Sequence, residues 1–139
     1  MNASRIGRLL LRIWWRTVSL VSVAIAQNDC RRAVASKRGL ELLKANLTPT
    51  QLDDFLTYRC FEVVGGSTGR IYRIRLSGPM NVEELDQRGR CIGRLCFFPE
   101  GWLVDGDIAL AQKVALESFE PEALAVANKF PSGPATCRW

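Results

Sequence analysis

The sequence predicts an α+β fold: an antiparallel β-meander of three to four strands packed against helices and preceded by an N-terminal basic helical arm. Three observations predict it. Short runs rich in β-branched and aromatic residues alternate with glycine-containing turns between residues 60 and 98. Stretches with helical periodicity lie before and after these runs. Positive charge is concentrated in the first 44 residues.

The chain of 139 residues has a net charge of +5 that is unevenly placed. Residues 1–44 contain nine Lys and Arg and two acidic residues, which gives +7, whereas residues 45–139 contain ten basic and twelve acidic residues, which gives −2. We therefore divide the chain into a basic helical arm (1–44), a compact α+β domain (45–130) and a loose tail (131–139). A basic arm on a mildly acidic body favours an anionic partner for the arm.

Four arginines recur in the arm at spacings of three, four and four, so they share one face of a predicted helix. They are Arg5, Arg8, Arg12 and Arg16, with Trp14 and Trp15 between the last two. Three interpretations compete. The first is a secretory signal with a cleavage site at residues 24–26. The second is an amphipathic helix on a membrane surface, with the tryptophans at the interface. The third is a helix packed on the body or on a partner.

A membrane-spanning helix is not expected in the arm. The uncharged run after Arg16, from Thr17 to Ala26, is ten residues long, whereas a spanning helix needs about 20.

Two further helices precede the predicted sheet. One covers residues 29–46, with Asp29 as its cap. The other covers residues 49–58, where Thr48 and Gln51 have the spacing of a capping box.

The predicted strands are separated by connections short enough to favour antiparallel neighbours. They cover residues 60–64, 70–76, 80–85 and 90–98. Alternation in the second strand places Tyr72 and Ile74 on the core face and turns its arginines to the other face. One interpretation is a cationic, anion-binding sheet face formed by Arg73, Arg75, Arg90 and Arg94. The alternative, which the pattern favours, is an ordinary solvated face on which these arginines pair with Glu62, Glu83 or Glu84.

After the sheet the sequence predicts a helix capped by Asp105 or Asp107 that reaches residue 118, and a final helix over residues 121–129. The tail that follows contains two prolines and a glycine.

The segment from about residue 39 to residue 128 resembles an uncharacterised family of small bacterial and phage-associated α+β domains. The resemblance implies the fold and no assigned activity, and it does not include the basic arm. It rests on Leu47-Thr48-Pro49 with Gln51, Phe61 to Gly65, Gly69 to Ile74, Asn81 to Leu85, Leu95-Cys96-Phe97, Pro99-Glu100-Gly101, Gly106-Asp107 and Leu110 to Lys113.

The absence of histidine narrows the chemistry of this chain. It excludes Ser–His and Cys–His nucleophile pairs and zinc sites built with imidazole. An odd number of cysteines without a CxxC motif favours free thiols in a reducing cytosol: Cys30, Cys60, Cys91, Cys96 and Cys137.

Three other patterns have both a chemical and a structural interpretation. The glycine-rich loop from Gly65 to Arg70 suggests a phosphate-binding loop, but a strand follows it, which favours a hairpin turn. Cys91 and Cys96 lie five residues apart on one strand and so point to opposite faces. The acidic pairs are adjacent on a strand or placed at a helix start: Glu83 and Glu84, Asp105 and Asp107. We therefore expect no catalytic residue, no metal site and no cofactor.

These features favour a non-enzymatic accessory protein, cytoplasmic or peripheral to the inner membrane. Its body would dock on a protein partner, and its arm would contact a membrane surface or an acidic partner. The alternative is a nucleic-acid-binding protein that uses the arm on phosphates. A third hypothesis is an enzyme with a carboxylate- or cysteine-based site. The sequence identifies no small-molecule substrate.

Overall fold

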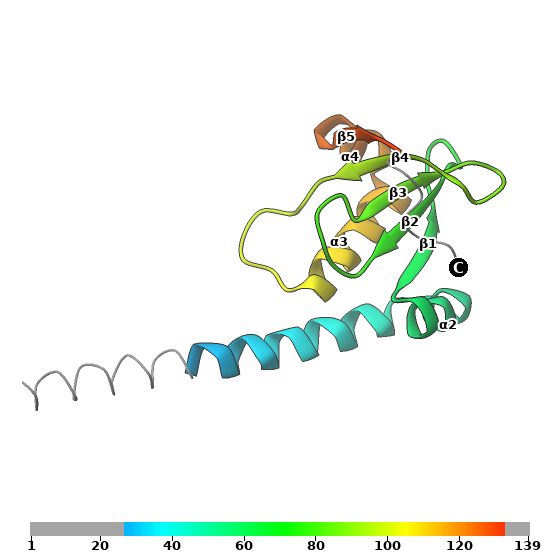
Figure 1. Cartoon of the computed structure of the whole chain (residues 1–139). Coiled ribbons are helices and arrows are strands. Elements are labelled where there is room, and N and C mark those ends of the chain that lie inside the picture. Colours follow the sequence, from blue (N-terminus) through cyan, green and yellow to red (C-terminus); the bar gives the residue numbers. More distant parts are fainter. Residues whose placement is uncertain (1–26, 133–139) are drawn as a thin grey trace, which may run out of the picture. The chain divides into compact units, whose positions relative to one another are not determined.

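The computed structural model describes residues 27–132. The fold is α+β, as the sequence predicts: helices pack against a five-stranded antiparallel sheet (Figure 1). The chain divides into two compact units, Met1–Ala35 and Ser36–Trp139, and the sheet belongs to the second. Residues 27–45 are helical, which confirms the helix expected over residues 29–46.

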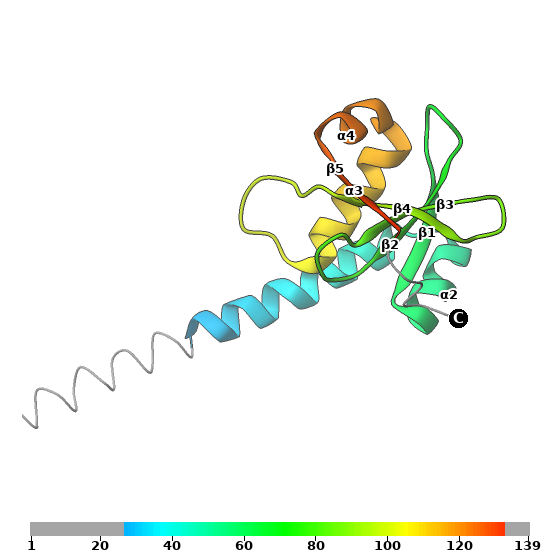
Figure 2. The same ribbon diagram turned by 45° about the horizontal axis from the view of Figure 1, so that its top comes forward.

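The strands lie side by side in chain order, and every neighbouring pair is antiparallel, so the predicted meander is confirmed (Figure 2). The strands are β1 (Cys60–Val64), β2 (Ile71–Arg75), β3 (Val82–Leu85), β4 (Cys91–Cys96) and β5 (Asn128–Pro131).

The last strand, β5, is not predicted. The sequence places residues 128–131 at the end of a helix and the start of the tail, but helix α4 (Glu120–Val126) ends earlier and β5 then pairs with β4. The strand has only four residues, and its lysine and proline weaken the β pattern. Both residue types are common on edge strands, because they discourage pairing with another chain.

Helix α2 (Pro49–Tyr58) begins as predicted. The Thr48 hydroxyl accepts a hydrogen bond from the Gln51 backbone N–H at 3.3 Å, and the Gln51 side chain accepts one from the Thr48 N–H at 3.1 Å. Helix α3 (Asp105–Ser118) begins differently from the prediction. Its N-cap is Val104, with no side-chain hydrogen bond, so neither Asp105 nor Asp107 is the cap. Both lie in the first turn, where the helix dipole favours negative charge.

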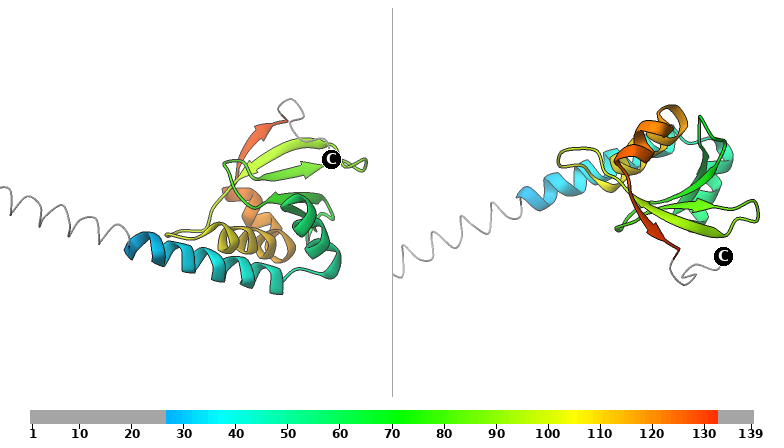
Figure 3. Two further views of the ribbon diagram at one scale, coloured as in Figure 1. Left: turned by 60° about the horizontal axis from the view of Figure 1, so that its bottom comes forward. Right: turned by 90° about the horizontal axis from the view of Figure 1, so that it is seen from above.

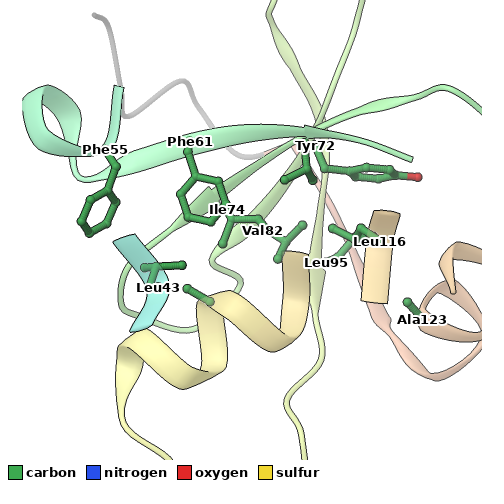
Figure 4. Close-up of a cluster of buried hydrophobic side chains, with 11 residues drawn as sticks. Leu43, Phe55, Phe61, Tyr72, Ile74, Val82, Leu95, Leu116 and Ala123 are labelled. Carbon is green, nitrogen blue, oxygen red and sulfur yellow. The ribbon is translucent and has the colours of Figure 1, made fainter. Parts of the chain in front are cut away.

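The core lies between the sheet and α3, which packs against β1 and β2 (Figure 4). Alternate residues of β1 and β2 enter it, and Phe61 lies opposite Ile74 in the register. Phe55 of α2 meets Phe61 edge to face, with ring centroids 6.2 Å apart. The same buried cluster includes Leu43, from the helix before α2, and Leu116, from α3. Burying large apolar side chains of this kind contributes about 1.5–3 kcal/mol each.

A pair of glycines allows the helix before α2 to approach the start of α3 closely. A Cβ atom on Gly106 would lie 2.4 Å from the carbonyl carbon of Gly39, and one on Gly39 would lie 2.5 Å from Val104 Cγ2. Both residues belong to the second compact unit. The crossing brings residues 36–45 beside α3 (Figure 3).

Two buried amides tie α3 to the sheet. The Asn81 amide donates to Gln112 Oε1 at 2.7 Å, and the Gln112 amide donates back to Asn81 Oδ1 at 3.0 Å. Gln112 also donates to the Phe97 carbonyl at 2.8 Å. These polar groups are therefore satisfied inside the fold, as buried amides must be.

Candidate functional site

Of the predicted arm, only residues 27–44 are described. The membrane- or partner-binding residues Arg5, Arg8, Arg12, Trp14, Trp15 and Arg16 lie outside the described residues. In the described helix, Arg31, Lys37 and Arg38 are exposed and form no ion pair with another residue of 27–132. No helix in the described range is both long enough and apolar enough to cross a bilayer.

Three of the four predicted anion-binding arginines come together on one face of the sheet. The register aligns a row of alternating charge across four strands: Glu62 opposite Arg73, Arg73 opposite Glu83, and Glu83 opposite Arg94. Arg75 reaches the same row from the next position on that face of β2. The cross-strand order of the meander therefore assembles this cluster, because directly opposed residues share a face.

Glu83 is the centre of this charged row. Arg73 Nη2 lies 2.8 Å from Glu62, and Arg75 Nη2 lies 3.0 Å from Glu83. Arg73 and Arg94 approach Glu83 at 3.6 and 3.7 Å. The arginines of this face are thus paired with Glu62 and Glu83, as the alternative interpretation expects. It is not solvated throughout, because Arg73 and Glu83 are each only 5% exposed.

The row retains an excess of positive charge. Three guanidinium groups, Arg73, Arg75 and Arg94, face two carboxylates, Glu62 and Glu83, which leaves one net positive charge among these five side chains. Anion binding by this face stays a prediction.

Arg90 does not join the other three arginines. Its guanidinium lies 2.7 Å from Asp86 in the hairpin between β3 and β4, and its side chain is 69% exposed. Hydrogen bonds from the backbone N–H and then the side chain of Arg90 hold the pKa of Asp86 below its ordinary value. The two-residue period of a strand would place Arg90 on the same face as Arg94. However, β4 begins only at Cys91, so Arg90 lies before the strand. The pairing of β3 with β4 also shifts register between Glu84 and Leu85.

The β1–β2 hairpin holds a buried carboxylate that sequence reasoning missed. Glu120 has no exposed surface, and one of its oxygens accepts hydrogen bonds from the backbone N–H groups of Ser67 and Thr68, both at 2.8 Å. The other oxygen accepts from the hydroxyls of Thr68 and Tyr72. Burial by itself would raise the pKa of Glu120, but the bonds from Thr68, Tyr72 and Ser67 lower it to about 2.

Two glycines make room for this arrangement. A Cβ atom on Gly65 would lie 2.3 Å from Glu120 Oε1, and one on Gly66 would lie 2.1 Å from the Glu117 carbonyl oxygen. The loop from Gly65 to Arg70 is therefore a hairpin turn, as predicted, and its converging N–H groups do bind an anion. That anion is the carboxylate of the protein's own Glu120.

Burial is the main cause that raises the pKa of Tyr72, and the hydrogen bond to Glu120 raises it further. The phenol therefore stays protonated at neutral pH and acts as a hydrogen-bond donor.

The structure places four of the five cysteines and both acidic pairs; Cys91 and Cys96 are half-buried, and Asp105 and Asp107 lie in the first turn of α3 rather than at its cap. Cys30, Cys60, Cys91 and Cys96 are free thiols, and burial raises the pKa of Cys60. Cys137 lies outside the described residues. Glu83 and Glu84 diverge, since Glu84 pairs with Arg70 at 2.9 Å. In the range 27–132 no three His, Cys, Asp or Glu side chains are grouped to hold a metal ion.

The connection between β4 and α3 exposes a group of apolar side chains that sequence reasoning also missed. We call residues 97–104 the aromatic loop. Phe98 is 50% exposed, Trp102 91% and Leu103 40%. The sequence marks this segment only as the end of the sheet, because Pro99 and Gly101 interrupt its pattern.

No protein-family model, curated protein or solved structure matches this chain.

Proposed function

We propose that this protein is a non-enzymatic accessory protein, peripheral to the inner face of a membrane. Its basic arm binds the anionic bilayer surface, and its compact domain docks on a protein partner. The observation that carries the proposal is the division of charge between +7 in residues 1–44 and −2 in the rest of the chain.

The cations of the compact domain and those of the arm differ in how often they pair with carboxylates. In residues 45–132, six of the nine cations pair with carboxylates: Arg70, Arg73, Arg75, Arg90, Arg94 and Lys113. In the described part of the arm, Arg31, Lys37 and Arg38 are exposed and have no carboxylate partner within residues 27–132. Exposed cations near an anionic membrane contribute about 1 kcal/mol each. The arm contains nine Lys and Arg residues in all, a number that supports membrane association.

The arginine stripe near the start of the arm supports the same partner. A helix with Arg5, Arg8, Arg12 and Arg16 on one face can present all four charges to lipid headgroups at once. Trp14 and Trp15 have the amphipathic rings that prefer the membrane interface.

The ionisable side chains of this chain favour a binding role over catalysis. It has no imidazole. The most perturbed carboxylate, Glu120, has a pKa of about 2 and faces four donors inside the fold. A carboxylate of that kind is a weak base near neutral pH.

Vesicle co-sedimentation of the full chain tests the proposal. We compare vesicles of phosphatidylcholine alone with vesicles that contain 30% phosphatidylserine. The test variant is R8Q/R12Q, and the control is R88Q/K129Q, which removes the same charge from two exposed residues of the compact domain.

We expect wild type to bind the acidic vesicles more tightly. R8Q/R12Q should weaken that binding by roughly tenfold or more, since two charges are lost at about 1 kcal/mol each. R88Q/K129Q should change it little. Equal effects of the two variants, equal binding to both vesicles, or no binding by wild type would contradict the proposal.

The second candidate function is nucleic-acid binding through the same arm, which the carboxylate-free stripe of four arginines also favours. It predicts an affinity for DNA or RNA that falls steeply with salt, because each neutralised phosphate releases counterions. A flat salt titration, or no binding at low salt, would exclude it.

A further inference from the structure

We propose that the C-terminal segment, residues 133–139, lies extended across the outer face of the sheet and covers it, with the indole of Trp139 packed against that face. The outer face is the side that carries the charged row, opposite the side of Tyr72 and Ile74. The segment lies outside the described residues. Two features support its placement: the burial of the outer face and the residue pattern of the segment.

The strand register defines which residues belong to the outer face. On β2 this face carries Arg73 and Arg75, which alternate with core residues. Directly opposed residues share a face, and they are Glu83 opposite Arg73, Cys60 opposite Arg75, and Leu85 opposite Ile71. Burial raises the pKa of the Cys60 thiol, and Arg75 and Arg73 oppose that shift. The thiol therefore lies close to the charged row.

The outer face is buried nearly as deeply as the core. Cys60 is 2% exposed and Leu85 is 5% exposed, although neither belongs to the buried cluster between the sheet and α3. Arg73 and Glu83 at the centre of the face are buried to the same degree. An antiparallel sheet with one face on the core commonly leaves its other face to water. The burial of these four residues therefore indicates a cover on the outer face.

The described helices that contact the sheet pack against its opposite side. Phe55 of α2 and Leu116 of α3 belong to the buried cluster that contains Phe61 and Ile74 (Figure 4). Within residues 27–132, α2 and α3 thus account for the burial of the core face. The segment after β5 is the part of the compact unit that we assign to the outer face.

The segment starts at the edge of this face and is long enough to cross it. Strand β5 pairs with β4 and ends at Pro131, which lies opposite Gly93. Crossing from β5 to β1 spans four strand spacings of about 4.8 Å, or ~19 Å. The eight residues from Ser132 to Trp139 span about 26 Å when extended, at ~3.3 Å per residue.

The pattern of the segment suits a sheet face. Apolar and polar residues alternate along its last five positions: Ala135, Thr136, Cys137, Arg138 and Trp139. In extended backbone, alternate side chains point to opposite sides, so the three apolar side chains can face the sheet while the two polar ones face water. This arrangement also keeps Arg138 away from the guanidinium groups of the charged row.

The charged row suits an indole as its cover. It contains three guanidinium groups, those of Arg73, Arg75 and Arg94. Guanidinium groups stack on aromatic faces, and tryptophan is the best aromatic partner for a cation. An indole on this row adds no charge. It also excludes water from the ion pairs, which strengthens their attraction.

The fluorescence of Trp139 tests whether its indole is covered. The full-length variant W14F/W15F/W102F leaves Trp139 as the only emitter. Adding R138W/W139R to that variant moves the indole by one position, to the side of the segment that faces water, without changing the composition. Both proteins are titrated with acrylamide in the absence of vesicles. We expect a blue-shifted emission and about threefold weaker quenching for Trp139 than for the moved indole, because a packed ring is shielded from the quencher.

Alkylation of Cys60 tests whether the covered surface is the outer face. W139A removes the indole, and V126A is the matched control at an apolar side chain of α4 that is 73% exposed. Iodoacetamide labelling of Cys60 is followed by peptide mass spectrometry, and urea denaturation gives the free energy of unfolding in the same buffer. We expect W139A to label Cys60 about tenfold faster, since a buried thiol reacts when its cover opens locally. V126A should leave the labelling rate unchanged.

Three results would overturn the inference. They are equal quenching of Trp139 and the moved indole, Cys60 labelling that W139A leaves unchanged, and faster labelling that only matches a loss of global stability. Each would mean that the side chains of the outer face cover one another or that another part of the chain covers them. These measurements involve no membrane, so their failure would leave the proposed function intact.

Discussion

The hydroxyl of Tyr72 donates a hydrogen bond of 2.8 Å to the carboxylate of Glu120, which is 48 residues away in the sequence. This bond joins β2, near its start, to the first turn of α4. With the bonds from Ser67 and Thr68, it fixes the β1–β2 hairpin against the end of the helical layer. Four donors around one buried carboxylate form a polar cluster that the fold needs in order to keep that charge inside.

Substitution of Glu120 should destabilise the compact domain. In Glu120→Gln an amide replaces one carboxylate oxygen, so its NH₂ group faces donors from Thr68, Tyr72 or Ser67. We expect the free energy of unfolding to fall by about 2–3 kcal/mol, since hydrogen bonds to a charged group are lost and buried donors are left unpaired. Urea denaturation at pH 7 measures this. An unchanged midpoint and slope would show that the cluster contributes little.

The same carboxylate should make stability depend on pH in the acid range. Its pKa is lower in the folded protein, about 2, than its ordinary value of 4.5, so the unfolded chain binds the proton more readily. The stabilisation is fully present above pH 4.5 and is lost as the pH falls toward 2. Glu120→Gln should lose less stability than wild type between pH 5 and pH 2. Urea denaturation of both proteins at a series of pH values measures this difference. Parallel curves would contradict the assignment.

Close packing at Gly106 gives a prediction with a matched control. In Gly106→Ala the new Cβ atom would lie 2.4 Å from backbone atoms of Gly39, whereas in Gly93→Ala it would have 3.8 Å to the nearest atom, the Phe130 carbonyl oxygen. We expect Gly106→Ala to lower the free energy of unfolding by about 3 kcal/mol, because the helix crossing must open. Gly93→Ala should change it by less than about 1 kcal/mol. Thermal denaturation compares them, and similar losses would refute the close crossing.

The charged row on the sheet should be sensitive at its buried centre, in contrast to the more exposed Arg70–Glu84 pair, which lies outside the row. Glu83→Gln removes the carboxylate that faces Arg73, Arg75 and Arg94, and we expect a loss of about 3 kcal/mol, because breaking a buried pair leaves charge uncompensated. Glu84→Gln breaks a pair with Arg70, whose side chain is 55% exposed, and should cost about 0–1 kcal/mol. Chemical denaturation of both variants measures the difference. Equal costs would show that burial of Glu83 does not matter.

Local sequence signals account for the parts of the fold that were predicted. Thr48 and Gln51 form their capping box within four residues, and the first four strands are separated by turns that glycine marks. The tertiary structure decides the rest. Arg90 leaves the cationic face because the hairpin folds it onto Asp86, and β5 forms only because β4 offers an edge to a weak strand sequence.

The buried carboxylate is the clearest case of a contact without a sequence signal. Ser67 and Glu120 are 53 residues apart, and nothing in the sequence pattern links the loop to the helix. Only the spatial approach of Gly65 and Gly66 to α3 and α4 brings them together. The aromatic loop was missed for a related reason, since exposure of Trp102 depends on what the rest of the chain covers.

The most direct test of the account is the partition coefficient of the full chain as a function of the phosphatidylserine content of the vesicles. The uneven charge, +7 in residues 1–44, predicts a coefficient that rises steeply from 0 to 30% phosphatidylserine and drops when salt screens the surface. A coefficient that stays constant across that range would contradict the central claim that the basic arm binds an anionic membrane.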